Sequence, residues 1–375
     1  MIGKPRNNRK RRKIAMFIPD LGGGGAERVF VTLAGYFAGL GFQVDLVLAV
    51  QRGPLINEVE PRVTVVDLAA DTEKPTWIFA LTTLVGLMSY LRRSKPDVLL
   101  VTLTGANLTA LVARMLSFRR FRLVIREAAS IANVKSHLRF TLMKLLYPLA
   151  DNIIVLTDHM KNEMLATLGL HADQISVIDN PIDYERIERL AQIKEVIEIS
   201  SNMRPYVVVV GRLVEQKDIA TAIRAVSLVS AKRPCNLVVI GEGPQKDELV
   251  MLSETLGISN RVFWLDYQSN PYPWMKQADA VLLTSKWEGY PNILLEAKSL
   301  GCPIVTTEYD SSVRQILSTY PKSLQHVVSV GDWNGMADAI LKFLDNDVKI
   351  DVDVLVNLKQ VANRYIATFD ITMPE

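Results

Sequence analysis

Short apolar runs, rich in β-branched residues, alternate with amphipathic helical patterns along the whole chain. The runs have the length of buried strands, and the segments between them have the apolar spacing of helices. In the first half we expect strands at Lys13–Ile18, Gln43–Leu48, Val63–Val66, Val98–Leu103, Arg122–Ile125, Asn152–Leu156 and Ile175–Ile178. In the second half we expect strands at Tyr206–Val210, Asn236–Ile240, Val262–Trp264, Ala280–Leu283, Pro303–Thr306 and Val327–Val330. The predicted helices include Ala26–Leu40, Ile219–Lys232, Lys246–Leu256 and Ile293–Leu300. This alternation is typical of parallel α/β layers.

Two such series in succession predict two doubly wound, Rossmann-like domains, and 375 residues are enough for both. The turn sequence at Asn180-Pro181 ends the first series, and the charged segment Tyr184–Arg204 resembles a helical connector. We divide the chain into a disordered basic tail at 1–12, an N-terminal domain at 13–182, a connector at 183–204, a C-terminal domain at 205–348, and a helical segment at 349–375 that could return to the N-terminal domain. Open sheets bind ligands outside the carboxyl ends of their strands, so the two domains could border one cleft.

Composition limits the function classes and the compartment. A net charge of +3 is too small to suit nucleic-acid binding across the whole surface, so we expect no nucleic-acid partner. Cys235 and Cys302 lie far apart in apolar contexts, which favours a reducing, cytoplasmic compartment without structural disulfides. No signal peptide is expected, because the apolar stretch Ile14–Ile18 is short and leads directly into a glycine loop.

Three segments could contact a membrane. Lys4–Lys13 carries seven Lys/Arg and no acid, which fits either a disordered tail or attraction to an anionic membrane surface. Thr76–Leu91 is apolar but shorter than the ~20 residues that a spanning helix needs, so we expect a core or interface helix, with shallow membrane contact as the alternative. Together with the apolar segment Leu138–Leu149, these features favour a peripheral membrane protein.

The most informative segment is Ser285–Pro303, which places two carboxylates around the start of a helix. Pro291 suits the first helical position, and Gly301 suits the position after the last turn. Glu288 would then lie in the loop that enters the helix, and Glu296 would lie inside the helix with its side chain tilted toward the same end.

The same helix start would offer hydrogen-bond donors. We expect the backbone N–H groups of Asn292 and Ile293 to be free there and to add positive potential. Donors for an anion beside carboxylate acceptors for hydroxyls match a phosphorylated sugar. An ordinary amphipathic helix with a surface glutamate is the alternative.

A glycine loop, Gly22–Gly25, follows the first predicted strand directly. Consecutive glycines allow the backbone to approach a ligand closely, and the start of the next helix attracts phosphate. A dinucleotide fingerprint is excluded, because its third glycine would fall on Glu27 or Arg28, and the Gly-Lys-Ser/Thr ending of a Walker loop is missing. Approach to an anion or a sugar is the preferred interpretation, and a flexible turn is the alternative.

Two further strand ends in the second half carry candidate ligand groups. After Tyr206–Val210, Arg212 offers a planar fork for phosphate oxygens and Lys217 offers a mobile point charge. Solvated basic side chains are the alternative. After Asn236–Ile240, Gly241 and Gly243 would permit close contact with a ligand.

Metal-binding patterns are weak. The histidines have no partners at zinc spacing; they are His137, His159, His171 and His326. Asp351 and Asp353 form a carboxylate pair near the C-terminus, where a solvated turn or strand is expected instead.

These motifs, in this order, resemble the family 4 retaining glycosyltransferases of GT-B fold. The resemblance rests on GGGGAERVFVTLAGYFAGLGFQV, VGRLVEQKD, VVIGEGPQKDELVMLSETLGISNRVFWLDY and SKWEGYPNILLEAKSLGCPIVTT, which span nearly the whole chain. It implies a nucleotide-sugar donor site in the C-terminal domain that works without a cofactor or a divalent metal.

The resemblance also implies roles for individual residues. Arg212 and Lys217 would hold the donor diphosphate, with Gly24 and Gly25 closing on it from the N-terminal domain. Glu288 would contact the transferred sugar, and Glu296 would bind the ribose hydroxyls. The implied donor-binding set is Gly24, Gly25, Arg212, Lys217, Gly241, Gly243, Tyr267, Glu288, Gly289, Tyr290, Asn292, Ile293 and Glu296. The implied catalytic set is Glu288, Arg212, Lys217 and Glu127.

Two positions depart from the family pattern. Ala128 stands where many relatives carry a histidine, so the acceptor-side role would fall to Glu127, while Arg126 would hold an acidic group. Asp266 stands where relatives often have glycine, which affects the pocket for the nucleotide base.

The resemblance implies transfer of a hexose or N-acetylhexosamine from a UDP- or GDP-linked donor to a glycan or polyprenyl-linked acceptor. The basic tail and the apolar segments favour a role at the membrane in surface polysaccharide biosynthesis. The enzyme would be cytoplasmic, or peripheral on the cytoplasmic face of the membrane. A nucleotide-sugar epimerase of the same fold and an inactive nucleotide-sugar-binding partner are the alternatives.

Overall fold

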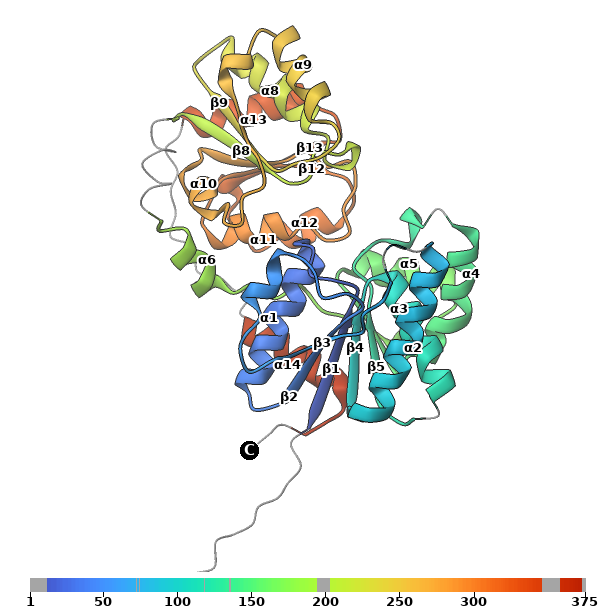
Figure 1. The fold of residues 1–375 in the computed structure, drawn as a ribbon. Coiled ribbons are helices and arrows are strands. Elements are labelled where there is room, and N and C mark those ends of the chain that lie inside the picture. The colour runs from blue at the N-terminus through green and yellow to red at the C-terminus, as the bar shows by residue number, and fades with distance from the viewer. Residues whose placement is uncertain are drawn as a thin grey trace, which may run out of the picture. The chain divides into compact units, whose positions relative to one another are not determined.

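The computed structural model describes residues 12–372 apart from 72, 74, 118, 135, 194–202 and 346–357. Most of the predicted basic tail and the pair Asp351 and Asp353 lie outside the described residues. The chain divides into two compact units, unit 1 at Met1–Pro181 with Leu358–Glu375, and unit 2 at Ile182–Asn357. Each unit is built around one parallel sheet (Figure 1).

Unit 1 contains a seven-stranded sheet of order β3-β2-β1-β4-β5-β6-β7 in which every pair is parallel. Its strands are β1 (Lys13–Ile18), β2 (Gln43–Leu48), β3 (Thr64–Asp67), β4 (Val98–Thr102), β5 (Arg122–Arg126), β6 (Asn152–Val155) and β7 (Ile175–Val177). Every residue of β4 is buried, because helices cover both faces of a parallel sheet. The predicted strands of this unit are confirmed, and no end is shifted by more than one residue.

Two layers of helices cover the sheet of unit 1. One face carries α1 (Gly25–Gly39) and the C-terminal helix α14 (Leu358–Phe369), and the other carries α2 (Thr76–Ser94), α3 (Thr104–Ser117), α4 (His137–Leu146) and α5 (Asp158–Leu168) (Figure 1). The sheet order explains this division, because right-handed crossovers place helices on opposite faces when the chain reverses direction across the sheet.

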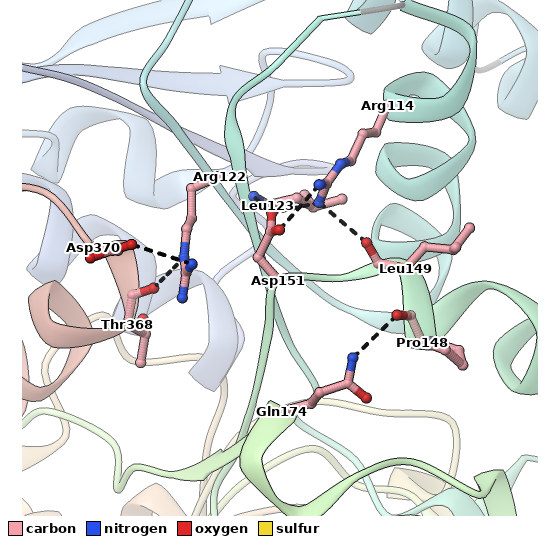
Figure 2. Close-up of polar contacts among 9 residues, drawn as sticks. All are labelled: Arg114, Arg122, Leu123, Pro148, Leu149, Asp151, Gln174, Thr368 and Asp370. Carbon is pink, nitrogen blue, oxygen red and sulfur yellow. Dashed lines mark hydrogen bonds and ion pairs between the residues drawn. The ribbon is translucent and has the colours of Figure 1, made fainter.

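Helix α14 is anchored in unit 1 at two ends of the same strand. The Arg122 side chain donates a hydrogen bond of 2.9 Å to the backbone oxygen of Thr368 and lies 3.7 Å from Asp370 (Figure 2). At the other end of β5, Arg126 donates to the hydroxyl of Tyr365 at 3.1 Å. The last helix is therefore a structural part of unit 1.

A second group of polar contacts ties the N-terminal ends of the strands together. Arg114 forms an ion pair of 2.5 Å with Asp151, which also accepts from the backbone N–H of Leu123 (Figure 2). At the start of β1, Arg12 pairs with Asp97 and Lys13 pairs with the buried Asp45. The last two residues of the basic stretch thus have structural roles.

Unit 2 contains a six-stranded parallel sheet of order β10-β9-β8-β11-β12-β13. Its strands are β8 (Tyr206–Val210), β9 (Asn236–Ile240), β10 (Val262–Leu265), β11 (Ala280–Leu283), β12 (Ile304–Glu308) and β13 (Gln325–Ser329). Its helices are α6 (Tyr184–Leu190), α8 (Ile219–Ser230), α9 (Lys246–Thr255), α10 (Tyr272–Gln277), α11 (Asn292–Ser299), α12 (Ser312–Leu317) and α13 (Trp333–Asp345). Apolar cores lie on both sides of the sheet, and the free cysteines Cys235 and Cys302 are buried in them.

Some local predictions need correction. The charged segment Tyr184–Arg204 was expected to be helical; α6 confirms this for Tyr184–Leu190, and residues 194–202 lie outside the described part. Pro291 is the N-cap of α11 instead of its first helical residue. The predicted stop is confirmed, since Gly301 follows the helix with a φ of +67°, where a side chain would be strained.

Candidate active site

In unit 2, several loops meet at the carboxyl edge of the sheet. Strand β11 lies between β8 and β12, so the loops that follow these three strands are neighbours. The Thr284 hydroxyl, after β11, donates to the backbone oxygen of Lys217 at 2.6 Å. Thr307, on β12, donates to the backbone oxygen of Ser285 at 2.7 Å. Ligand sites of open α/β sheets lie at this edge.

Glu288 is the centre of these contacts. Its side chain is 8% exposed, and Lys217 Nζ lies 2.5 Å from its Oε1. The Ser285 hydroxyl donates to the same oxygen at 2.6 Å, while Gln216 Nε2 donates to Oε2 at 3.3 Å. The structure therefore brings Glu288 and Lys217, two predicted site residues, into direct contact, and holds the carboxylate in one orientation.

Arg212 remains open at the same edge. It follows β8, its side chain is exposed, and among the described residues its guanidinium has no ion pair or hydrogen bond. An unpaired exposed guanidinium can form two parallel hydrogen bonds with phosphate oxygens without first losing an internal partner.

The glycines after β9 have a structural reason that the sequence did not indicate. A Cβ on Gly241 would lie 2.0 Å from the backbone oxygen of Gly211, and one on Gly243 would lie 2.3 Å from that of Leu213. The backbone of Leu213 also donates to the oxygen of Glu242 at 2.8 Å. These glycines let the β8 and β9 loops pack closely, and their contact with a ligand stays a prediction.

The start of α11 differs from the expectation. The N–H of Asn292 was predicted to be free, but it donates to the backbone oxygen of Tyr290 at 3.1 Å. The Ile293 side chain is buried in the core beside Tyr290, so only its backbone could contact a ligand. Glu296 is half-buried within the helix. Gly289 lies in the loop between Glu288 and this start.

Tyr309 is a candidate that sequence reasoning missed. It follows β12, and its buried hydroxyl makes no hydrogen bond of ordinary geometry within the described residues, although Ser312 lies close enough to lower its pKa. Burial, followed by the charge of Glu288, raises the pKa of Tyr309, so the hydroxyl stays protonated. A buried hydroxyl without a well-formed hydrogen bond is rare, and here it is close enough to the Glu288 carboxylate to respond to its charge. No sequence motif marks this tyrosine, because its position depends on how β12 lies beside β11.

The end of β10 supplies two predicted residues. The Tyr267 side chain is exposed. The backbone N–H of Tyr267 donates a hydrogen bond of 3.2 Å to the side-chain carboxylate of Glu242. Asp266, which departs from the family pattern, pairs with Lys246 at the start of α9 at 2.5 Å. A carboxylate at this position therefore carries its own counter-charge.

In unit 1, local backbone geometry and close contacts explain why glycines occupy the loop Gly22–Gly25. Gly23 has a φ of +93°, and Gly24 is the N-cap of α1, followed by Gly25 as the first helical residue. A Cβ on Gly24 would lie 2.6 Å from the Glu27 carboxylate. The loop thus begins a helix as predicted, and its approach to a donor stays a prediction.

Glu127 lies at the end of β5 in a closed polar cluster. It is buried, and it accepts hydrogen bonds from Tyr147 at 2.6 Å, Thr104 at 3.0 Å and Asn107 at 3.4 Å. Burial raises the pKa of Glu127, and the hydrogen bonds oppose that shift. Its acceptor-side role stays a prediction, but the carboxyl has internal partners and little exposure.

The expectation for Arg126 is wrong. It was predicted to hold an acidic group, but its buried guanidinium donates to three neutral groups, the hydroxyls of Tyr365 and Thr102 and the side-chain oxygen of Asn180.

No group of three metal-ligating side chains occurs among the residues that the structure describes.

Comparison with protein-family models identifies both halves of the chain. Residues 23–186 match the model described as Glycosyltransferase Family 4, and residues 192–360 match Glycosyl transferases group 1. The chain is a family 4 glycosyltransferase.

Curated relatives of this glycosyltransferase cover most of its length. The Campylobacter jejuni N-acetylgalactosamine-N,N'-diacetylbacillosaminyl-diphospho-undecaprenol 4-alpha-N-acetylgalactosaminyltransferase is 29% identical over 345 residues, which cover 90% of this chain and 91% of that protein. The amylovoran biosynthesis glycosyltransferase AmsD of Erwinia amylovora is 24% identical over 78% of this chain and 80% of its own.

Solved structures show that the glycosyltransferase has the GT-B fold. Anabaena Alr3699/HepE in complex with UDP and glucose superposes with a TM-score of 0.78 at 15% identity, covering 96% of this chain and all of that one. WaaG, a glycosyltransferase involved in lipopolysaccharide biosynthesis, superposes with a TM-score of 0.69 at 17% identity, covering 95% of this chain and 96% of that one. The predicted fold class and family are confirmed.

Proposed function

We propose that this glycosyltransferase moves a hexose or N-acetylhexosamine from a UDP- or GDP-linked donor to a glycan or polyprenyl-linked acceptor, with retention at the anomeric carbon. The observation that carries the donor site is the Lys217–Glu288 pair beside the exposed Arg212 at the carboxyl edge of unit 2. Structures of the same fold in complex with UDP and with UDP-glucose support a nucleotide sugar. The name of the Campylobacter relative, which specifies a diphospho-undecaprenol substrate, supports a lipid-linked acceptor.

Each charged group at this edge has a task in the proposed reaction. Arg212 and Lys217 neutralise the diphosphate as it leaves, and Glu288 accepts a hydrogen bond from a hydroxyl of the transferred sugar. The acceptor hydroxyl attacks the anomeric carbon on the face that the diphosphate leaves. The new glycosidic C–O bond forms as the C–O bond to phosphate breaks, and the proton passes to a diphosphate oxygen.

Donor binding would rearrange the Lys217–Glu288 pair. In the structure these opposite charges form an ion pair with each other. A diphosphate offers Lys217 a stronger anionic partner, and Glu288 then turns to a sugar hydroxyl. The contact of Lys217 with the diphosphate and the contact of Glu288 with the sugar would therefore form together, when both parts of the donor are present.

We also propose that transfer needs neither a cofactor nor a divalent metal. Two side-chain cations at one strand edge can supply the charge that a metal would supply to the leaving diphosphate. Addition of EDTA to the purified enzyme should leave the transfer rate nearly unchanged. Complete loss of activity, with recovery on adding Mg²⁺ or Mn²⁺, would contradict this proposal.

The location proposed is the cytoplasmic face of a membrane, where the enzyme would be peripheral and act in surface polysaccharide biosynthesis. AmsD and WaaG, whose names place them in amylovoran and lipopolysaccharide biosynthesis, support this setting. Among the described residues, no helix is both long and apolar enough to cross a bilayer.

The deciding experiment incubates the pure enzyme with radiolabelled UDP- and GDP-sugars and a bacterial lipid extract. Label that moves into lipid or glycan supports transfer. An isomerised nucleotide sugar would identify an epimerase, and binding without turnover would identify an inactive partner. Glu215 provides a matched control, because it lies in the same loop as Lys217 but pairs with Lys286 on the exposed surface. Glu215→Gln should therefore keep full activity.

A further inference from the structure

One helical layer of unit 1 carries a strongly uneven charge. Residues 75–150 contain eleven Lys/Arg and two acids, Asp97 and Glu127, which leaves 32 Lys/Arg against 38 Asp/Glu in the rest of the chain. Glu127 is buried, and Asp97 pairs with Arg12 beneath the sheet. Helices α2, α3 and α4 of this layer contain no carboxylate at all. Their outer surface is therefore positive, although Arg114 of α3 is paired with Asp151 just before β6.

The same helices expose large apolar side chains in stripes. On α2, Trp77, Leu81 and Val85 recur at four-residue intervals and lie 52–68% exposed. This spacing places them on one side of the helix, opposite the buried Thr83 and Tyr90.

Helix α4 repeats the pattern. Leu138 and Leu145 are 71% and 65% exposed, Leu142 lies between them, and only Met143 of this helix is buried. The end of α3, between these helices, exposes Met115 and Leu116. We call the surface formed by these exposed side chains of α2, α3 and α4 the apolar-basic face.

Cations accompany the apolar stripes. Arg139 and Lys144 lie exposed on α4, and Arg119 and Arg120 lie exposed just after α3. Within the described residues none of the four has an ion pair, whereas elsewhere on the surface many basic side chains do. The acids nearest to the face along the chain are Asp71 and Glu73, before α2, and Asp151, which pairs with Arg114. Glu163 of α5 is already bonded to Ser130 and to backbone N–H groups.

We propose that the apolar-basic face docks on an anionic lipid bilayer, with the apolar stripes in the headgroup region and the cations against acidic headgroups. Helices that lie in the interface between membrane and water combine exposed apolar side chains with cations. Helices α2, α3 and α4 have this composition. A protein partner would suit apolar side chains alone, but the absence of any carboxylate across three helices favours a uniformly negative surface. The proposal deepens the peripheral membrane location proposed above.

The test measures binding of the full-length enzyme to sedimented vesicles of phosphatidylcholine alone and with phosphatidylglycerol. Each cation near an anionic surface contributes about fivefold to binding, so Arg139→Gln with Lys144→Gln should weaken binding by about 30-fold. Leu138→Asp with Leu145→Asp should weaken it at least tenfold. Binding of the native enzyme should require phosphatidylglycerol and should fall as salt rises from 0.1 to 0.5 M, because screening shortens the reach of the charges.

Matched controls lie on unit 2. Met251→Asp changes an equally exposed apolar residue of α9, and Lys232→Gln removes an exposed cation after α8. Both should bind vesicles like the native enzyme. All variants should melt at the native temperature and show the native thermal shift with UDP, which establishes that they are folded.

Four results would overturn the proposal. The first two are that both variants of the face bind vesicles like the native enzyme, and that the native enzyme binds the two vesicle types equally. The third is that a variant with Arg9, Lys10 and Arg11 changed to Gln loses all binding. The fourth is that light scattering shows a native dimer, which Leu138→Asp dissociates. The assay is independent of sugar transfer. Glu288→Gln should bind vesicles normally. The proposed docking of the apolar-basic face would therefore remain valid even if the proposed chemistry were wrong.

Discussion

The burial of the Lys217–Glu288 ion pair predicts how much stability the protein should lose when one of the two charges is removed. The change is Glu288→Gln, which keeps the shape of the side chain and removes its charge. The carboxylate is 8% exposed and Lys217 is 19% exposed, so the variant leaves a largely buried ammonium opposite a neutral amide. Loss of one partner of a fully buried pair costs about 3–5 kcal/mol, and the remaining exposure of Lys217 lowers this to about 2–3 kcal/mol. For a domain of this size the melting temperature should fall by about 4–12 °C.

Transfer activity should fall at least 100-fold, because the amide cannot replace the carboxylate at the sugar hydroxyl. A double variant, Glu288→Gln with Lys217→Met, separates the two effects. It removes both charges, so most of the lost stability should return, while activity should stay absent. The assays are thermal unfolding and radiolabel transfer at a temperature well below both transitions. Full activity of folded Glu288→Gln would refute the donor-site assignment, and unchanged stability would refute the buried-pair reasoning.

Three further predictions test other parts of the structure. Tyr309→Phe should leave the free energy of unfolding within about 0.5 kcal/mol of the native value, since the hydroxyl makes no hydrogen bond of ordinary geometry, but should lower kcat/KM for the donor. Unchanged kinetics would remove Tyr309 from the site. Arg126→Met should destabilise unit 1 by about 3 kcal/mol and speed hydrogen exchange in α14, because its partners Tyr365 and Asn180 lose a buried donor; native protection of α14 would contradict this role. Because the folded pKa of Glu127 is raised, its stabilising contribution is complete below about pH 4.3 and is lost as pH rises through the folded value. Glu127→Gln should therefore be less sensitive than the native enzyme to a change from pH 5 to pH 8 in urea unfolding, and an identical pH dependence would contradict the buried-acid interpretation.

Local patterns were sufficient for the elements of the fold. The strands could be predicted because a parallel sheet covered on both faces needs continuous apolar runs, as in β4 and β8. The stop of α11 could be predicted because Gly301 adopts a left-handed φ that other residues avoid. Its start was wrong by one residue, because proline suits the first helical position but Pro291 is the N-cap.

Side-chain partners were predicted less well. Arg126 was expected to meet an acid, yet its partners are neutral, because α14 returns to β5 from a position 239 residues later in the chain. The glycines after β9 looked like ligand contacts, but close packing of two loops explains them, and a sequence pattern does not distinguish a ligand from a neighbouring backbone.

The sequence by itself determined two α/β halves, their family motifs, and which strand ends carry Arg212, Lys217 and Glu288. Only the tertiary structure decided that Lys217 and Glu288 touch, across 71 residues, and that Tyr309 lies near them. The reason is that apolar periodicity specifies strands and their buried faces but not which strands become neighbours. That order, with β11 between β8 and β12, follows from how helices of a given length cross a twisted sheet, and it assembles the site.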